Sequence, residues 1–269
     1  MIRLPVAPAR GETFRHSSLK TGIALSSHAH SETGSPSART KDPVNQSLID
    51  LRDRVGVARL GLMNNQVWHD DPKRLAFTLA RYKFVAKMLK GRERVLEVGC
   101  GDAFGSRLVR QDVKSLLATD FDPLFIEDAR QRMSPPWDFE VATHDILAGP
   151  VPGQFDAAYT LDVLEHIPAT HEDIFLDNIK ASLTEHGTCI VGMPSLESQS
   201  YASPASRAGH INCMTGEHFR QVMERHFHNV FIFSMNDEVV HTGFLPMAHY
   251  LLAIACSKRL RAAGGTTTP

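Results

Sequence analysis

The fold is decided at residues 94–105, which read RVLEVGCGDAFG. An aliphatic run at 95–98 is followed by closely spaced glycines and then by further apolar residues, which predicts a buried strand turning sharply into a helix. Gly99 and Gly101 have no Cβ, so the main chain can take unusual angles there and a ligand can lie against it. Amides at the start of the helix would point at this ligand. We therefore predict a cofactor-binding turn.

The neighbours of this turn indicate the kind of ligand. A dinucleotide-binding turn has the form G-x-G-x-x-G/A, and its last small residue would fall on Phe104, where strand and helix must pack closely. Glu97 stands just before the glycines, and its carboxylate would repel a pyrophosphate but suits a cationic amino group. We expect a ligand that carries a positive charge.

The segment from Glu97 to Gly101 resembles motif I of the class I S-adenosylmethionine-dependent methyltransferases, written E/D-x-G-x-G-x-G. Ala103 stands in place of the third glycine, so we expect a slightly altered turn with binding retained. The resemblance implies S-adenosyl-L-methionine as the cofactor and S-adenosyl-L-homocysteine as its product. It also implies that Glu97, Gly99 and Gly101 contact the cofactor.

Residues 155–167, FDAAYTLDVLEHI, resemble the fourth-strand motif of small-molecule methyltransferases. The resemblance places Asp162 at the methionine end of the cofactor, with Glu165 and His166 entering the next helix. In the ubiquinone-pathway O-methyltransferases a similar E-x-x-E-H group holds a divalent metal, whereas this chain has D-x-x-E-H. Because the E-H dipeptide is also widespread in metal-independent relatives, we expect no metal and assign Glu165 and His166 to the helix start or the substrate.

Two further strand ends carry polar residues, and in an open α/β sheet the ligand lies beyond these ends. Asp120 closes the second predicted strand and is placed to accept both ribose hydroxyls, although the same residue would serve NAD. Its alternative role as a helix N-cap is better filled by Asp122, just before Pro123. Asp145 and Ile146 resemble the adenine clamp of the family, with an ordinary Asx turn as the alternative.

His210 follows the fifth predicted strand and is the best candidate for a general base, because imidazole titrates near neutrality. A loop histidine bonded to the main chain is the alternative, and His166 is the second catalytic candidate. The spacing of His210 and Cys213 hints at zinc, but two ligands make a weak case. The residues whose role stays open, in an expected hairpin loop, are Asp237, Glu238 and His241.

The expected fold is α/β, with a doubly wound, mostly parallel, seven-stranded Rossmann-like sheet and a helical N-terminal extension. We divide the chain into a flexible tail at 1–43, N-terminal helices on the substrate side at 44–92, the cofactor-binding domain at 93–260 and a flexible tail at 261–269. The extension should contain helices at 46–63 and, capped by Asp71, at 72–89. The strands are expected at 94–98, 115–119, 138–142, 155–161, 188–193, 229–234 and 248–256.

Composition narrows the partners and the compartment. Lys and Arg number 29 against 30 Asp and Glu, so no nucleic-acid partner is expected. The longest apolar run is too short to enter a membrane. The four cysteines form no C-x-x-C pair, which is typical of a reducing compartment, so we expect a cytoplasmic protein. If the protein is not a monomer, a homodimer is the expected assembly.

These observations predict methyl transfer to a small-molecule acceptor, most readily at a hydroxyl oxygen of a natural product, a saccharide or a quinone-like metabolite. An exocyclic base amine is disfavoured because no N-P-P-Y motif follows the fourth predicted strand, where residues 160–163 read TLDV. Two alternatives stay open, namely an NAD-dependent oxidoreductase on the same kind of sheet and a non-catalytic module that binds S-adenosylmethionine.

Overall fold

The computed structural model describes residues 38–259 of the 269-residue chain. The predicted C-terminal tail and residues 1–37 of the predicted N-terminal tail lie outside the described residues. Two compact units divide between Ala58 and Arg59. In the described part of the first unit, α1 (Gln46–Val55) follows the 3-10 turn η1 (Pro43–Asn45). The remaining elements belong to the second unit, and the segment boundaries proposed from the sequence stay predictions.

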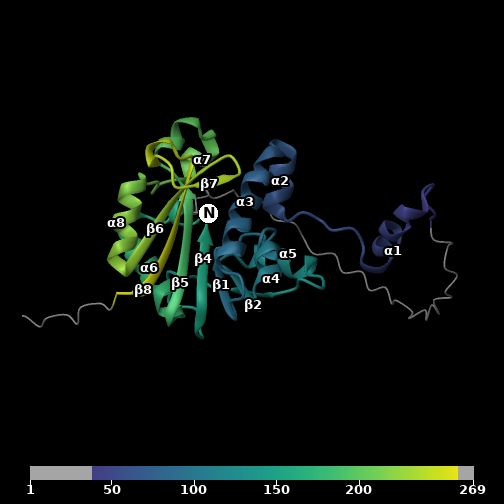
Figure 1. Ribbon diagram of the computed structural model, residues 1–269, viewed down its shortest axis with the longest axis horizontal. Helices are drawn as coiled ribbons and strands as arrows, with labels where there is room; N and C mark the ends of the chain where they lie inside the picture. The colour runs from purple at the N-terminus through teal and green to yellow at the C-terminus, as the bar shows by residue number, and fades with distance from the viewer. Residues whose placement is uncertain (1–37, 260–269) are drawn as a thin grey trace, which may run out of the picture. The chain divides into compact units, whose positions relative to one another are not determined.

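The second unit is built on one eight-stranded sheet with the order β3-β2-β1-β4-β5-β8-β6-β7 (Figure 1). The strands from β3 to β5 in this order are parallel, and β8 lies antiparallel between β5 and β6. The α/β fold is confirmed, with one strand more than the seven expected, because β7 forms a short edge strand in the expected hairpin loop. The strands are β1 (Arg94–Val98), β2 (Ser115–Asp120), β3 (Glu140–Thr143), β4 (Phe155–Leu161), β5 (Leu183–Pro194), β6 (Phe227–Asn236), β7 (Val239–His241) and β8 (Tyr250–Lys258).

Helices cover both faces of this sheet (Figure 1). The helices are α2 (Leu62–Asp70), α3 (Lys73–Met88), α4 (Ser106–Asp112), α5 (Pro123–Arg132), α6 (Glu172–Ser182), α7 (Pro204–Gly209) and α8 (Gly216–His226). The 3-10 turns are η2 (Leu164–His166), η3 (Ala169–His171), η4 (Glu197–Tyr201) and η5 (Leu245–Met247). Across residues 38–259, no helix combines the length and the apolar character that a membrane crossing requires.

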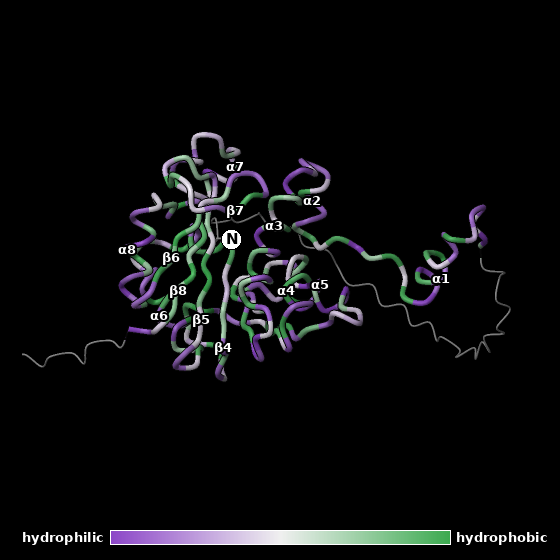
Figure 2. Tube along the Cα trace, viewed as in Figure 1, coloured by the Kyte–Doolittle hydropathy of each residue, from purple (hydrophilic) through white to green (hydrophobic). Residues whose placement is uncertain are grey.

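The central strands β4, β5 and β8 are buried over most of their length, and Figure 2 shows that β8 is largely hydrophobic. Alternate residues of a strand point to opposite faces, so β1 contributes to two cores. Leu96 packs in one core with residues of α6 and α8, and Val95 packs in the other with residues of α3 and α4. With both faces covered, the carboxyl ends of the parallel strands are the part of the sheet where a ligand can bind.

The leading helices differ from the prediction. The single helix expected at 46–63 is wrong, because α1 ends at Val55 and α2 begins at Leu62. Gly56 takes a φ of +77°, and a helix cannot continue through that conformation. The expected cap by Asp71 is also wrong, since the amide of Asp71 donates to Val67 and ends α2 instead.

Candidate functional site

The turn between β1 and α4 has three residues with positive φ. The angles are +75° at Gly99, +53° at Gly101 and +52° at Ala103. A Cβ on Gly99 would lie 2.3 Å from Cγ2 of Val163, and a Cβ on Gly101 would lie 2.6 Å from Sδ of Met63. Both glycines are favoured by their positive φ, and at Gly99 the rigid side chain of Val163 also leaves no room for a Cβ. Ala103 takes the same conformation in spite of its Cβ.

Helix α2 lies on this turn, a contact that the sequence did not reveal. The backbone amide of Asn64 donates to Oδ2 of Asp102 over 2.8 Å, and its side-chain Nδ2 donates to Oδ1 over 2.7 Å. A Cβ on Gly61 would meet the Asp102 carboxylate at 2.3 Å. The start of α2 is thus fixed over the candidate cofactor turn.

The side chain of Glu97 lies on the face of the sheet that α3 covers, and the residue is 1% exposed. The Tyr82 hydroxyl donates to its Oε1 over 2.9 Å, and the Tyr159 hydroxyl donates to its Oε2 over 2.7 Å. Burial raises the pKa of Glu97 to about 7, although these two hydrogen bonds act in the opposite direction. The carboxyl group is therefore poised to ionise when a cation approaches.

Asp120 lies at the carboxyl end of β2, and its side chain binds the turn after β1 as well as the backbone just after β2. The amide of Gly101 donates to its Oδ2 over 2.8 Å, and the amide of Asp122 donates to its Oδ1 over 2.9 Å. A carboxylate oxygen can accept a second hydrogen bond, so these contacts are compatible with ribose binding. The predicted N-cap is confirmed for Asp122, whose Oδ1 accepts from the amide of Leu124 over 2.9 Å.

Asp145 and Ile146 follow β3. Oδ1 of Asp145 accepts from the amide of Leu147 over 2.9 Å, which is the Asx turn considered as the alternative role. Ile146 is 7% exposed and belongs to the α6 and α8 core. The role of these two residues as an adenine clamp stays a prediction, because the turn leaves Oδ2 of Asp145 able to accept another hydrogen bond.

Asp162 follows β4 with a φ of +58° and forms an ion pair that the sequence did not predict. Nη1 of Arg81 in α3 lies 2.7 Å from its Oδ2, and the Arg81 guanidinium also stacks 3.9 Å over the ring of Tyr250. The charge of the Asp162 carboxylate is therefore already compensated by Arg81.

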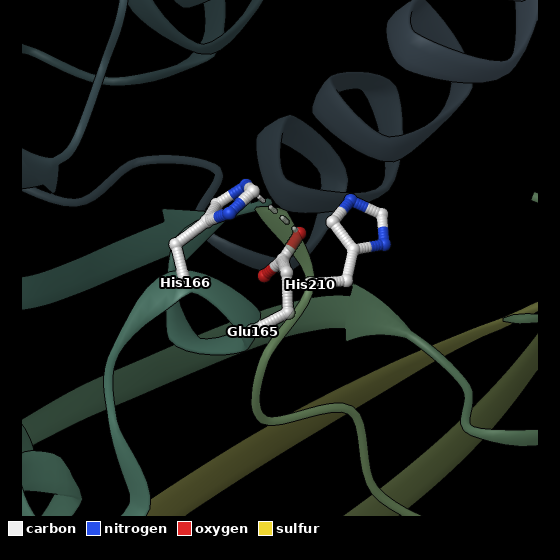
Figure 3. A group of neighbouring side chains, drawn as sticks. All are labelled: Glu165, His166 and His210. Carbon is white, nitrogen blue, oxygen red and sulfur yellow. Dashed lines mark ion pairs between the residues drawn. The ribbon is translucent and has the colours of Figure 1, made fainter. Parts of the chain in front are cut away.

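The two catalytic candidates lie together at the end of β4 (Figure 3). The rings of His166 and His210 are 5.1 Å apart between centroids, and the Glu165 carboxylate lies beside them. Nδ1 of His166 bonds to the carbonyl oxygen of Gly209 over 2.8 Å, and Nδ1 of His210 bonds to Oε1 of Gln199 over 2.9 Å. Burial lowers the pKa of both histidines, which keeps them neutral near pH 7.

Glu165 is fully buried in the short turn η2, where the sequence suggested the start of a longer helix. Its backbone carbonyl accepts hydrogen bonds from the amides of Ile211 and Asn212, at 2.9 and 3.0 Å. These bonds fix the segment after α7 against η2, and they bring His210 to His166. The pKa of Glu165 is raised well above its usual range by burial and, second, by the charge of Asp162.

The remaining candidates lie apart from this group. Within the described residues, the group of close metal-ligating side chains contains Glu165, His166 and His210, and Cys213 is outside it. Asp237 occupies the turn between β6 and β7 with a φ of +50°, and His241 bonds through Nε2 to Oδ1 of Asn236 over 2.9 Å. The expectation of a hairpin at this position is confirmed.

Comparison with known proteins identifies the central part of the chain. Residues 95–187 match the family model described as methyltransferase domain. Ubiquinone biosynthesis O-methyltransferases from several strains of Xanthomonas campestris pv. campestris are 34% identical over 101 residues. That match covers 36% of this chain and 40% of the relatives, so the chain corresponds to about two fifths of their length.

Solved structures share the fold at low sequence identity. The N-methyltransferase NodS from Bradyrhizobium japonicum is 19% identical, with a TM-score of 0.52 over 71% of this chain and 99% of NodS. A TehB-like S-adenosylmethionine-dependent methyltransferase from Corynebacterium glutamicum is 18% identical, with a TM-score of 0.53 over 81% of this chain and all of its own. A second NodS structure, also 19% identical with a TM-score of 0.51, covers 71% of this chain and 90% of its own and contains S-adenosyl-L-homocysteine.

Proposed function

We propose that this chain, which belongs to the class I S-adenosylmethionine-dependent methyltransferases, transfers the methyl group of its cofactor to a hydroxyl oxygen of a small molecule. The family and the cofactor rest on the matched domain and the shared fold. The acceptor and the roles of individual residues are the parts that we propose.

The arrangement at the strand ends supports this cofactor. Glu97 would accept from the amino group, and Asp120 would accept from the ribose hydroxyls, with the glycine turn between them. Asp145 and Ile146 would hold the adenine, and Asp162 would lie at the methionine end. In the sheet these strands lie in the order β3-β2-β1-β4, so the four positions would run in sequence from the adenine end to the methionine end of the ligand.

Methyl transfer from this cofactor requires the protein mainly to position the two reactants. The sulfonium is already an activated electrophile, so the acceptor oxygen must be held in line with the S–CH3 bond while water is excluded. The oxygen attacks the methyl carbon, the S–CH3 bond breaks, and S-adenosyl-L-homocysteine leaves as a neutral thioether. The hydroxyl proton must also leave, and a general base assists this step.

The pair of neutral imidazoles is the observation that carries the hydroxyl assignment (Figure 3). In each histidine Nδ1 is engaged with an oxygen acceptor, which leaves the lone pair of Nε2 to receive a proton. We assign the base to His210, with His166 as its neighbour. The name of the curated relatives, which are O-methyltransferases, supports the same acceptor atom.

Calorimetry and a turnover assay test the proposal. The wild-type chain should bind S-adenosyl-L-homocysteine and consume S-adenosyl-L-methionine with an acceptor from a panel of phenols, quinols and saccharides. His210→Ala should lose turnover at least a hundredfold while cofactor affinity is kept. His186→Ala, which removes an exposed histidine of β5, is the matched control. A wild-type rate in His210→Ala would remove the base role, and cofactor binding without any turnover would favour the non-catalytic module.

A further inference from the structure

The Glu165 carboxylate lacks a counter-charge of its own. The residue is 0% exposed, and neither of its oxygens has a hydrogen-bond partner among residues 38–259. An ionised carboxylate buried without a partner costs several kcal/mol, so it either stays protonated, as the raised pKa of Glu165 favours, or binds a cation. In both states its two buried oxygens lack hydrogen-bond partners within the described part of the chain, and an ordered ion would supply them with a ligand contact. The cation of Arg81 is already engaged by Asp162. A cation bound beside Glu165 would neutralise its carboxylate and contact these two oxygens.

The two histidines beside it are oriented as metal ligands usually are. A carbonyl oxygen can only accept, so the Nδ1 atoms of His166 and His210 must donate to Gly209 and Gln199. This fixes the tautomer in which Nε2 carries the lone pair. Ligating histidines in metal sites almost always give their other ring N–H to a carbonyl or carboxylate in this way.

The distances allow the three side chains to share one ion. One ligand atom from each of Glu165, His166 and His210 lies within 4.8 Å of the others, and Nε2 of His166 is 4.0 Å from Oε1 of Glu165. Ligand atoms around a tetrahedral zinc ion are about 3.3 Å apart, given bonds of about 2.0 Å. A movement of each ligand atom by about 1 Å toward a common centre would therefore bring the three atoms to the separation found around zinc. Figure 3 shows the Glu165 carboxylate lying between the rings of His166 and His210.

We propose that Glu165, His166 and His210 bind a single divalent transition-metal ion, with zinc as the ion that best fits the donor set. One carboxylate and two imidazoles suit zinc, whereas magnesium and calcium prefer oxygen ligands alone. The set differs from the one implied by the D-x-x-E-H motif, because Asp162 is held by Arg81 and His210 takes its place. Three protein ligands leave a fourth position open.

The open position gives the site a function that rests on the proposed methyl transfer. A hydroxyl oxygen bound there would have its pKa lowered by the metal charge, and its proton would pass to solvent before the O–CH3 bond forms. Metal binding would replace the base role of His210, because the Nε2 lone pairs of His166 and His210 would then be donated to the ion. In this form of the reaction His210→Ala still abolishes turnover, but through loss of the metal.

Zinc titration of the full chain, stripped with chelator and free of cofactor, tests the site. We expect one zinc equivalent to bind at pH 7.5 with micromolar or tighter affinity. His210→Ala and Glu165→Gln should each weaken this binding at least tenfold, while the control His186→Ala leaves it unchanged. Circular dichroism checks the fold of each variant, and cobalt in place of zinc should give a visible absorption band that only the wild type and the control retain.

The outcomes separate the two proposals. Zinc affinity that stays at the wild-type value in His210→Ala and in Glu165→Gln would overturn the metal site, since the bound ion would then lie elsewhere on the chain. Absence of zinc binding to the wild type would overturn it as well. Binding of S-adenosyl-L-homocysteine is measured separately, and its loss would count against the proposed function without affecting the metal result.

Discussion

Nη1 of Arg81 donates to both carboxylate oxygens of Asp162, over 2.8 and 2.7 Å, and so joins α3 to the carboxyl end of β4. The Arg81 side chain is 19% exposed and that of Asp162 is 36% exposed, so the pair is intermediate between a buried and a surface ion pair. This contact fixes α3 to the segment that links β4 to η2, the turn in which Glu165 and His166 lie.

Loss of this ion pair should lower stability moderately. We expect Arg81→Met to reduce the free energy of unfolding by about 1–2 kcal/mol, between the values for exposed and fully buried pairs. The double variant Arg81→Met/Asp162→Asn should recover part of the loss, because it leaves no unpaired charge. Urea unfolding at pH 7.5 measures both effects. Equal stability of the wild type and Arg81→Met would show that the pair contributes nothing.

Gly101 should be essential for the cofactor. A valine there requires a β-branched residue at a φ of +53° and places Cβ 2.6 Å from Sδ of Met63. We expect Gly101→Val to stay folded and to lose at least a hundredfold in affinity for S-adenosyl-L-homocysteine. Gly91→Val is the matched control, because Gly91 has a φ of +83° with nothing within 4 Å of a Cβ and precedes β1 at its opposite end. Micromolar affinity retained in Gly101→Val would contradict the turn assignment.

Substitutions at Asp120 and Asp122 should distinguish an effect on cofactor binding from an effect on helix capping. Asp120→Ala should weaken binding of S-adenosyl-L-homocysteine by about tenfold to a hundredfold, since hydrogen bonds to a charged group contribute about 1.5–3 kcal/mol. Asp122→Ala should cost about 1 kcal/mol of stability through loss of the α5 cap, with affinity unchanged. Calorimetry and thermal unfolding on both variants give the comparison. An unchanged dissociation constant in Asp120→Ala would remove its ribose role.

Glu97 should make cofactor binding dependent on pH. Its pKa of about 7 in the free protein means that part of the population is protonated at neutral pH, and a cationic amino group favours the ionised form. Affinity for S-adenosyl-L-homocysteine should therefore rise between pH 6 and pH 8, by up to about tenfold, and level off above pH 8. Calorimetry at pH 6.5 in two buffers of different ionisation enthalpy should detect proton release. Glu97→Gln should bind more weakly and lose this pH dependence.

Local patterns were enough to predict the framework of the site. The strand, glycine turn and helix at residues 94–112 are encoded by neighbours in the chain, as is the cap formed by Asp122. The polar residues at the strand ends were found because the order of a parallel sheet places them along one edge. These features depend on short-range propensity and on a topology that few connections can satisfy.

The tertiary contacts were not predictable in the same way. Arg81 and Asp162 are 81 positions apart, and nothing in either segment specifies the other. The approach of His210 to His166 depends on backbone bonds between Glu165 and the segment after α7. The leading helices were misjudged because an apolar period continued through Gly56, although the positive φ of that glycine ends α1. The strand β7 has three residues, too few for a recognisable alternation.

Ala103 keeps the backbone of the turn at a position where the motif is written with glycine. A left-handed conformation costs an alanine about 1–2 kcal/mol, which the packing of a side chain 5% exposed evidently offsets. The sign of φ alternates along the turn, and residues 99, 101 and 103 have the positive values that side chains disfavour. A search for this backbone conformation would therefore also find chains with alanine at the third position, which a sequence pattern that requires glycine there would miss.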